Sequence, residues 1–260
     1  MKKFFNKKNI MRILFFIFLL GLIYSVCYFI SYQKEDANLD KQLKKIEEVI
    51  TNNDTDEPET NSNNTPQDKT EEYLKKDLND LKEINSDVKG WIKVNGTQIS
   101  YPFVQTNNNS YYLNHSFDKT ENRAGWVFLD YRNNIDNLSN KNNILYAHNM
   151  RTKKMFGSLK NILTNGWLEN KSNHVVELST MDKKTKWQVF SVYIVPKTSD
   201  YIKTSFKNNE EFEEFLNMIS ERSIHDFNIE TNANDKILTL STCYNHVNRL
   251  VLHAKLIKAS

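Results

Sequence analysis

The chain has 260 residues, of which 35 are Lys or Arg and 32 are Asp or Glu, so its formal net charge is +3. Five of the basic residues lie within residues 1–12, which contain no acid, so the rest of the chain carries −2 and no nucleic-acid partner is expected. Two Cys, six Gly and four Pro residues also exclude disulfide-stapled, collagen-like and Pro/Gly-rich low-complexity chains.

The first predicted element is a membrane-spanning helix. Residues 13–32 contain no charged residue, and roughly 20 apolar residues are needed to cross a bilayer core of about 30 Å. Basic residues precede the run and acidic residues follow it, which predicts a cytoplasmic tail over 1–12, a single-pass anchor and an extracellular remainder. A cleaved signal peptide and a lipoprotein signal ending at Cys27 are the alternatives. No small-x-small cleavage site follows the run, and Val26 is bulky for a lipoprotein signal.

A stalk and linker are predicted over residues 33–70. Aliphatic residues recur at helical spacing between 37 and 50, which indicates a short stalk helix. Residues 51–70 contain five acids, one Lys and no large apolar residue. Such a segment cannot bury a core, so we expect a disordered spacer there.

Residues 71–260 are predicted to form a single, mostly β domain. Its first element is a helix over 71–84, whose Leu and Ile residues share one face. Asn95-Gly96 is a strong hairpin signal between the first two strands, and further helices are expected over 154–163 and 209–222. The short strands and inserted helices predict a closed or nearly closed eight-stranded β-barrel. The expected strands are 91–94, 97–104, 125–129, 143–147, 174–178, 186–195, 236–242 and 249–257.

Cys243 is the candidate nucleophile, because it is the only cysteine outside the predicted anchor and a lone thiol in an oxidising exterior is seldom structural. Side chains alternate along a strand. If the apolar faces of the last two strands line the barrel, Cys243 and Arg249 therefore lie together on its outer face. A neighbouring cation favours the nucleophilic thiolate. The alternative is that Cys243 is a small buried core residue.

A cysteine nucleophile needs a proton carrier, and the chain has six histidines. His148 closes a predicted strand, and His246 is three residues from Cys243. The Cys-x-x-His spacing could form part of a zinc site, but neither a second cysteine nor a histidine cluster accompanies it. We therefore expect no metal and no other cofactor. Spacing alone does not decide which histidine acts, since each could be a surface or a satisfied core residue.

Residues 239–243, Thr-Leu-Ser-Thr-Cys, resemble the TLxTC signature of sortases, with a histidine upstream and an arginine on the next strand. The similarity runs from about Ser86 to the C-terminus. The segments that resemble class B sortases in particular are 90–105, 109–114, 128–132 and 146–156.

The resemblance implies a closed eight-stranded barrel with an N-terminal helix and an inserted helix. It also implies three catalytic residues: Cys243 as nucleophile, His148 as acid and base, and Arg249 as the residue that holds the substrate and the oxyanion. The substrate-binding residues that it implies are Asn109, Leu113, Tyr201, Ile202 and Ser241.

The activity implied by the resemblance is that of a membrane-anchored cysteine transpeptidase. Its substrates would be secreted proteins, whose C-terminal sorting motif is cleaved after Thr through a thioacyl enzyme. Its acceptor would be an amine on a lipid-linked peptidoglycan precursor. The sequence departs from the family pattern at Ala147, where Gly usually precedes the histidine, and at Asn245, where some relatives have an acid. The connection between Cys243 and Arg249 is also short.

Three other functions are weighed against this one. Pilin-polymerising sortases usually carry a second, C-terminal membrane segment and an N-terminal lid, and neither is recognised here. Cell-wall cysteine hydrolases normally have Cys before His in the chain, the reverse of the order in this sequence. A catalytically inactive binding module would give no reason for Cys243, His148 and Arg249 to match together.

Overall fold

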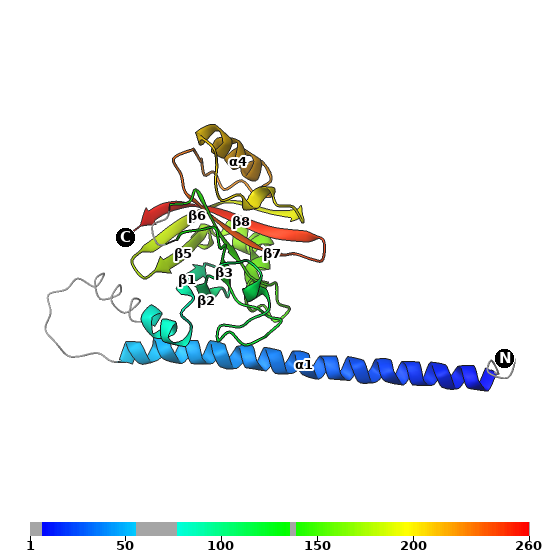
Figure 1. The fold of residues 1–260 in the computed structure, drawn as a ribbon. Helices are drawn as coiled ribbons and strands as arrows, with labels where there is room; N and C mark the ends of the chain where they lie inside the picture. Colours follow the sequence, from blue (N-terminus) through cyan, green and yellow to red (C-terminus); the bar gives the residue numbers. More distant parts are fainter. Residues whose placement is uncertain (1–6, 56–76, 136–138, 260) are drawn as a thin grey trace. The chain divides into compact units, whose positions relative to one another are not determined.

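The computed structural model describes residues 7–55, 77–135 and 139–259 (Figure 1). The chain divides into two compact units, Met1–Lys44 and Lys45–Ser260. Helix α1 (Lys7–Thr55) accounts for the described part of the first unit, and a β-barrel makes up most of the second.

Helix α1 runs without a break for 49 residues. It is long and apolar enough to cross a membrane, by length and composition. The stalk helix expected over 37–50 is present as part of α1, which continues from the predicted anchor without a break. The predicted disordered spacer is wrong over residues 51–55, because α1 extends to Thr55. No glycine or proline interrupts residues 22–57, and the Lys, Glu, Gln and Leu residues of this stretch favour a helix. The rest of the expected spacer, 56–70, lies outside the described residues.

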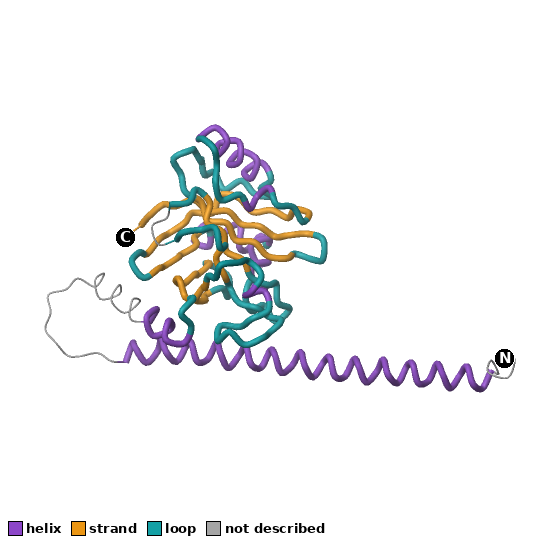
Figure 2. The backbone as a smooth tube through the Cα atoms, in the orientation of Figure 1, coloured by secondary structure: helices purple, strands orange, loops and turns teal. Residues whose placement is uncertain are grey.

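Eight strands close into a barrel in the order β1-β2-β3-β4-β7-β8-β6-β5, with β5 pairing back to β1. Figure 2 shows these strands at the centre of the second unit, with loops and short helices around them. The pairs β2–β3 and β4–β7 are parallel, and the other pairs are antiparallel. The predicted closed eight-stranded barrel is therefore confirmed. The strands are β1 (Val88–Val94), β2 (Ser100–Val104), β3 (Phe128–Leu129), β4 (Asn142–Tyr146), β5 (Val175–Thr180), β6 (Lys184–Pro196), β7 (Ile237–Cys243) and β8 (Asn248–Ala259).

The connection between β1 and β2 is longer than the two-residue turn that the sequence suggests, since β2 begins at Ser100. Thr97 explains the difference. Its Oγ1 donates a hydrogen bond to the Val94 carbonyl (2.8 Å) and accepts one from the Ile99 N–H (3.0 Å), which holds the intervening residues in a turn. Gly96 within this turn has a φ of 71°, a conformation that glycine adopts without steric cost.

Helix α4 (Asn209–Glu221) covers part of the outer face of the barrel, in the insertion between β6 and β7 (Figure 1). The Asn208 side chain caps it by accepting a hydrogen bond from the Glu211 N–H (3.0 Å). Its four buried apolar side chains pack against outward-facing residues of β6, β7 and β8, such as Ile237 and Val251. Each such burial contributes about 1.5–3 kcal/mol. The inserted helix predicted over 209–222 is thus confirmed.

Helix α4 and its neighbours cover the outer face of β7 and β8 but leave the facing ends of these two strands partly exposed. Every residue of β7 is buried except Cys243, its last residue, which is half-buried. At the facing end of β8, Asn248 and Arg249 are also half-buried, and the next five residues are buried. The ends of β7 and β8 that carry Cys243 and Arg249 are therefore accessible.

The remaining helices are short. The helix expected over 154–163 is a 3₁₀ helix that starts only at Gly157, because Lys153 (φ 64°) and Met155 (φ 52°) adopt left-handed conformations that an α-helix excludes. Residues 77–84 are helical as expected, and residues 71–76 lie outside the described residues. The short helices are η1 (Tyr111–Leu113), η2 (Gly157–Leu163), α3 (Asn165–Glu169), η3 (Lys171–Asn173) and η4 (Asp200–Ile202).

Candidate active site

The parallel pair β4–β7 carries His148 and Cys243 to the same edge of the barrel. The last paired residues are Tyr146 and Ser241, and His148 and Cys243 follow two positions later on their respective chains. Beyond the ladder, the Thr242 hydroxyl donates a hydrogen bond to the Ala147 carbonyl (2.7 Å). This bond keeps the two chains adjacent up to the predicted catalytic residues.

The antiparallel pair β7–β8 places Arg249 directly opposite Cys243, as the alternation of side chains predicts. Four residues connect the two strands. Within the connection, the Asn245 side chain accepts hydrogen bonds from the Val247 N–H (3.0 Å) and the Asn248 N–H (2.7 Å). Asn245 thus stabilises the turn, because its side-chain oxygen accepts hydrogen bonds from two backbone N–H groups. The pairings of β4, β7 and β8 therefore bring the backbone at His148, Cys243 and Arg249 to the same edge of the barrel.

The ring of His148 is oriented by a backbone group. Its Nε2 atom lies 2.8 Å from the Leu113 carbonyl oxygen. A carbonyl oxygen can only accept a hydrogen bond, so Nε2 carries a proton and Nδ1 is the nitrogen that remains for proton exchange. A base that is itself oriented by a third group is the usual partner of an activated nucleophile.

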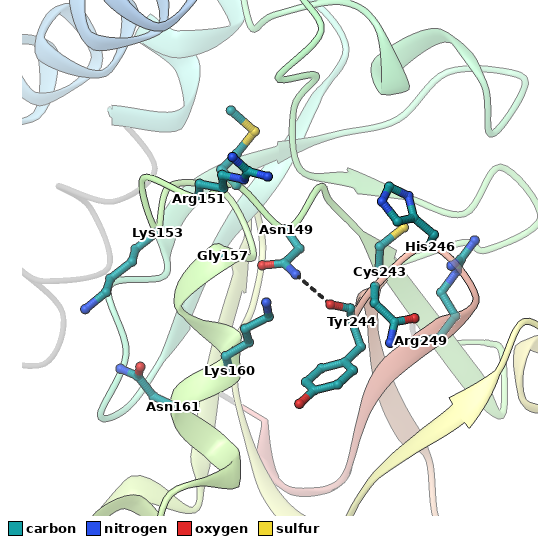
Figure 3. Close-up of a pocket in the computed structure, with 12 residues that line it drawn as sticks. Asn149, Arg151, Lys153, Gly157, Lys160, Asn161, Cys243, Tyr244, His246 and Arg249 are labelled. Carbon is teal, nitrogen blue, oxygen red and sulfur yellow. Dashed lines mark hydrogen bonds between the residues drawn. The ribbon is translucent and has the colours of Figure 1, made fainter.

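A cavity of about 720 Å³ opens beside Cys243. Figure 3 shows Cys243, His246 and Arg249 on one side of it, with Arg151 and Lys160 on the other. The Asn149 side-chain amide donates across the cavity to the Tyr244 carbonyl (3.4 Å; Figure 3). The Thr242–Ala147 bond links the two chains just before Cys243 and His148, and the Asn149–Tyr244 bond links them just after.

The sortase family model, described as a sortase domain, matches residues 92–257. The chain belongs to the sortase family. It is 32% identical over 236 residues to Sortase B of Staphylococcus aureus, covering 89% of this chain and 88% of that protein. It is 33% identical over 188 residues to Sortase B of Listeria monocytogenes, covering 71% and 75%. Among solved structures, the S. aureus sortase B–substrate complex superimposes with a TM-score of 0.70 at 30% identity, covering 88% of this chain and 99% of that one.

Sortases are cysteine transpeptidases, and these matches confirm the predicted family, the class B resemblance, the barrel and the enzyme class. The roles of Cys243, His148 and Arg249 in this sortase remain predictions. Their placement is what the roles require: a half-buried thiol, a permanent cation paired with it in register, and an oriented imidazole at the end of the adjacent strand.

His246 is the histidine that competes with His148 for the role of base, because it lines the cavity together with Cys243 (Figure 3). It is exposed in the β7–β8 connection, and within the described residues no hydrogen bond holds its ring. The hydrogen bond to Leu113 distinguishes His148 from it and favours His148 as the acid and base of the sortase.

Two of the predicted substrate-binding residues contact each other beneath the outer surface. The Tyr201 hydroxyl lies 2.9 Å from the Ser241 hydroxyl, and only 3% and 4% of these two residues are exposed. Burial raises the pKa of Tyr201, so its hydroxyl stays protonated and can serve as a hydrogen-bond donor. A bound peptide would reach only the small accessible part of this pair.

Asn109 and Ile202, two of the other three predicted substrate residues, are connected through a buried carboxylate that the sequence did not single out, whereas the Leu113 carbonyl contacts His148. Asp130, fully buried, accepts hydrogen bonds from Asn109 Nδ2 (2.9 Å), the Tyr146 hydroxyl (2.9 Å) and Arg132 Nε (2.8 Å). Arg132 Nη2 donates in turn to the Ile202 carbonyl (3.0 Å). Asp130 thereby joins two predicted substrate residues to the end of β4, two residues before the predicted catalytic histidine.

The charge of Asp130 is maintained despite its burial. Burial acts to raise the pKa of this carboxyl, but the hydrogen bonds from Arg132 and Tyr146 outweigh it and hold the pKa below its usual value. The sequence signal for such a residue is an acid directly after the short apolar strand β3. Its partners are distant in the chain, so sequence spacing alone does not reveal them.

His253 belongs to a buried network that does not include Cys243. Its Nδ1 lies 2.8 Å from the Thr239 hydroxyl and its Nε2 lies 2.8 Å from the Tyr193 hydroxyl. Burial, reinforced by the positive charge of Arg222, lowers the pKa of His253 to about 3. A neutral imidazole with a hydrogen bond at each ring nitrogen stabilises the fold and is a poor candidate for proton transfer.

Proposed function

We propose that this sortase is a membrane-anchored enzyme that cleaves secreted proteins after the Thr of a C-terminal sorting motif and joins them to an amine of a lipid-linked peptidoglycan precursor. The observation that carries the proposal is that the pairings of β4, β7 and β8 bring His148, Cys243 and Arg249 to the same edge of the barrel, where Cys243 is half-buried. The similar S. aureus sortase B was solved as a complex with its substrate, which supports a substrate-binding function for this chain.

The first step forms the thioacyl enzyme. The Cys243 thiolate attacks the carbonyl carbon of the Thr, a C–S bond forms, and the C–N bond to the next residue breaks. His148 gives its Nδ1 proton to the departing amine. The guanidinium of Arg249, which has no carboxylate partner within the described residues, is free to donate to the oxyanion of the tetrahedral intermediate.

The second step transfers the acyl group. The acceptor amine attacks the thioester carbonyl, a C–N bond forms, and the C–S bond breaks to release the Cys243 thiolate. His148 Nδ1 takes the proton that the amine loses, which returns the enzyme to its starting state. The thioester retains the energy of the cleaved amide, so no cofactor is needed.

The length and apolar composition of α1 support a membrane anchor. We propose that residues 1–12 lie in the cytoplasm, that 13–32 cross the membrane, and that 33–70 form a stalk and linker, helical to Thr55. Residues 71–260 would then be the extracellular catalytic domain. This arrangement keeps the enzyme where secreted substrates and lipid-linked precursors both pass.

Product analysis tests the proposal. The full-length protein in detergent would be given peptides containing Asn-Pro-x-Thr-like and Ser/Pro-Pro-x-Thr-like motifs, with and without an added amine. We expect cleavage after Thr and, with the amine, a new amide product, both of which require Cys243. Cleavage without transfer to any amine would instead indicate a cysteine hydrolase, and the absence of any Cys243-dependent turnover would overturn the proposal.

A further inference from the structure

The orientation of His148 depends on the position of one backbone carbonyl group. Its Nε2 atom lies 2.8 Å from the Leu113 carbonyl oxygen, and Leu113 is the last residue of the three-residue helix η1. A single 3₁₀ turn has poor internal hydrogen bonds, so its position depends on its contacts with the rest of the domain. The residues that hold η1 in place therefore determine how the His148 ring is oriented.

Tyr112, the residue before Leu113, is held by its side chain. It is 1% exposed. Its hydroxyl donates a hydrogen bond to Asp87 Oδ2 (2.8 Å) and accepts one from Asn85 Nδ2 (2.8 Å). Burial raises the pKa of Tyr112, so the hydroxyl stays protonated and continues to donate. The hydroxyl thereby links η1 to the segment that leads into β1.

The two partners of the Tyr112 hydroxyl are themselves fixed. Asn85 Nδ2 also donates to the Phe117 carbonyl (2.7 Å), and Asn85 Oδ1 accepts from the Asp87 N–H (2.9 Å). The Asp87 carboxylate lies 3.0 Å from Lys119 Nζ. A buried polar network in which each member has its partners is rigid. This network holds the chain at Tyr112 and again at Phe117, on both sides of Leu113.

The backbone of η1 is held by the turn that leads to β3. The Trp126 N–H donates to the Tyr112 carbonyl (2.9 Å). Gly125 has a φ of 59°. A Cβ at Gly125 would overlap the Tyr112 carbonyl oxygen and lie 2.9 Å from the Leu113 carbonyl oxygen, closer than side chains normally approach. The turn therefore lies directly against both carbonyl groups, an approach that glycine permits.

The Leu113 carbonyl is thus fixed through the side chain of the preceding residue and through the glycine that lies against it. We propose that Tyr112 and Gly125 are positioning residues of this sortase, which act through the Leu113 carbonyl to hold His148 with Nδ1 available for proton exchange. The inference rests on the proposed function, in which His148 gives a proton to the departing amine. It adds to that function the residues that orient the acid.

The choice of leaving group distinguishes a displaced His148 from a general loss of stability or binding. A sorting peptide cleaved at an amide must give a proton to the departing amine, whereas the same peptide with a thioester at that bond releases a thiolate without one. Full-length enzyme in detergent would be mixed with each substrate, and formation of the thioacyl enzyme on Cys243 would be followed in single turnovers. The ratio of the amide rate to the thioester rate then reports on proton transfer, because losses of folding or peptide binding lower both rates.

The first variant removes one hydroxyl. Tyr112→Phe keeps the buried ring, and we expect it to lower the ratio about tenfold or more, since general acid catalysis contributes about 10²–10⁴-fold and depends on position. Tyr193→Phe is the matched control. It also removes a buried hydroxyl, one that lies 2.8 Å from His253 Nε2, and should retain the wild-type ratio.

The second variant acts on the backbone. Gly125→Ala places a Cβ against the Leu113 carbonyl and should also lower the ratio about tenfold or more. Gly96→Ala introduces the same strain at another left-handed glycine, where the Cβ would meet Asn173 and Trp167 instead, and should retain the ratio. If Gly125→Ala does not fold, Tyr112→Phe decides the question alone.

The outcomes separate the two proposals. An unchanged ratio in Tyr112→Phe, or in folded Gly125→Ala, would overturn the positioning inference and leave the transpeptidase intact. An equal fall in Tyr193→Phe or Gly96→Ala would overturn it as well, because the ratio would then follow stability. His148→Ala should lower the ratio most. A wild-type ratio in that variant, or no thioacyl enzyme from the amide peptide in the wild type, would refute the proposed function and the inference with it.

Discussion

At the scale of single residues, the chemistry depends on which histidine exchanges protons with Cys243. His148 is oriented by the Leu113 carbonyl, His246 is exposed at the cavity, and His253 is buried in its own network. Only the first arrangement combines access to the site with a fixed ring. The roles can therefore be separated by substitution.

We expect His148→Ala and Arg249→Ala each to lower kcat/KM for a sorting peptide by at least about 100-fold, because they remove the acid–base group and the oxyanion donor. His246→Ala should stay within a few-fold of wild type. Steady-state cleavage assays on the three variants provide the comparison. The assignment would fail if His246→Ala were the inactive one.

Asp130 is the residue whose effect we expect to appear in substrate binding. Asp130→Asn removes the charge that pairs with Arg132 and disturbs the contacts to Asn109 and Tyr146. We predict a loss of roughly 10- to 100-fold in kcat/KM for the sorting peptide, mainly through a higher KM. Asp226→Asn, at an exposed loop carboxylate, is the matched control. An unchanged KM in Asp130→Asn would remove Asp130 from the substrate site.

The lowered pKa of the buried His253 predicts how the free energy of unfolding depends on pH. Its pKa is lowered to about 3 in the folded protein and is about 6.5 in an unfolded chain. The unfolded state therefore binds an additional proton between these values, so His253 stabilises the fold above pH 6.5 and this contribution is lost as the pH falls toward 3. The maximal slope is about 1.4 kcal/mol per pH unit.

Denaturant unfolding of wild type and His253→Gln between pH 7 and pH 4 measures this slope. We expect the free energy of unfolding of the variant to depend less steeply on pH, whatever its absolute stability. His246→Gln, at an exposed histidine, should retain the wild-type slope. Parallel pH profiles for wild type and His253→Gln would contradict the assignment.

At the scale of elements, the existence of the strands could be predicted because each is encoded by a local run of sequence. Short β-rich runs predicted all eight strands, and the alternation of side chains along the last two placed Cys243 and Arg249 together on one face, as their pairing shows. The errors arose where side chains bond the backbone or where a pattern has no stop signal. The hydrogen bonds of Thr97 make the first turn longer than predicted. The left-handed conformations of Lys153 and Met155 make η2 begin later than predicted. Helix α1 extends further than predicted, through residues that include no helix breaker.

The site itself was only partly accessible to sequence reasoning. Cys243 and Arg249 share one hairpin, so their pairing follows from local register. His148 was assigned by family resemblance, because its proximity to Cys243 depends on the parallel pairing of β4 with β7, which joins segments about a hundred residues apart. Asp130 was missed for the same reason, since its partners come from separate loops and strands.

The link between β4 and β7 can be tested through Thr242. Thr242→Val removes the hydroxyl that bonds the Ala147 carbonyl, and leaves a buried carbonyl without that donor at a cost of about 1–3 kcal/mol. We expect kcat to fall about tenfold or more because the ends of the strands lose their alignment. Thr242→Ser keeps the hydroxyl and should retain near wild-type kcat. Equal activity of the two variants would show that the bond does not position the site.

At the scale of the whole molecule, the charge distribution separates targeting from catalysis. The five cations of residues 1–12 precede the apolar run that begins at residue 13, and the predicted catalytic residues lie more than a hundred residues later. Removal of residues 1–32 should therefore move the protein from the membrane fraction to the soluble fraction, while cleavage of a soluble sorting peptide continues. Fractionation of cells that express the two forms checks this. Retention of the truncated form in membranes would contradict the proposed anchor.

The central claim is that Cys243 carries the acyl group of a sorting peptide. The most direct measurement is the intact mass and peptide map of the full-length enzyme after mixing with a sorting peptide in the absence of an amine. We expect an added mass equal to the acyl fragment of the peptide up to its Thr (the free fragment less water), located on Cys243, removed by hydroxylamine and absent from Cys243→Ala. Cleavage of the peptide without an adduct at Cys243, or with unchanged turnover in Cys243→Ala, would contradict it.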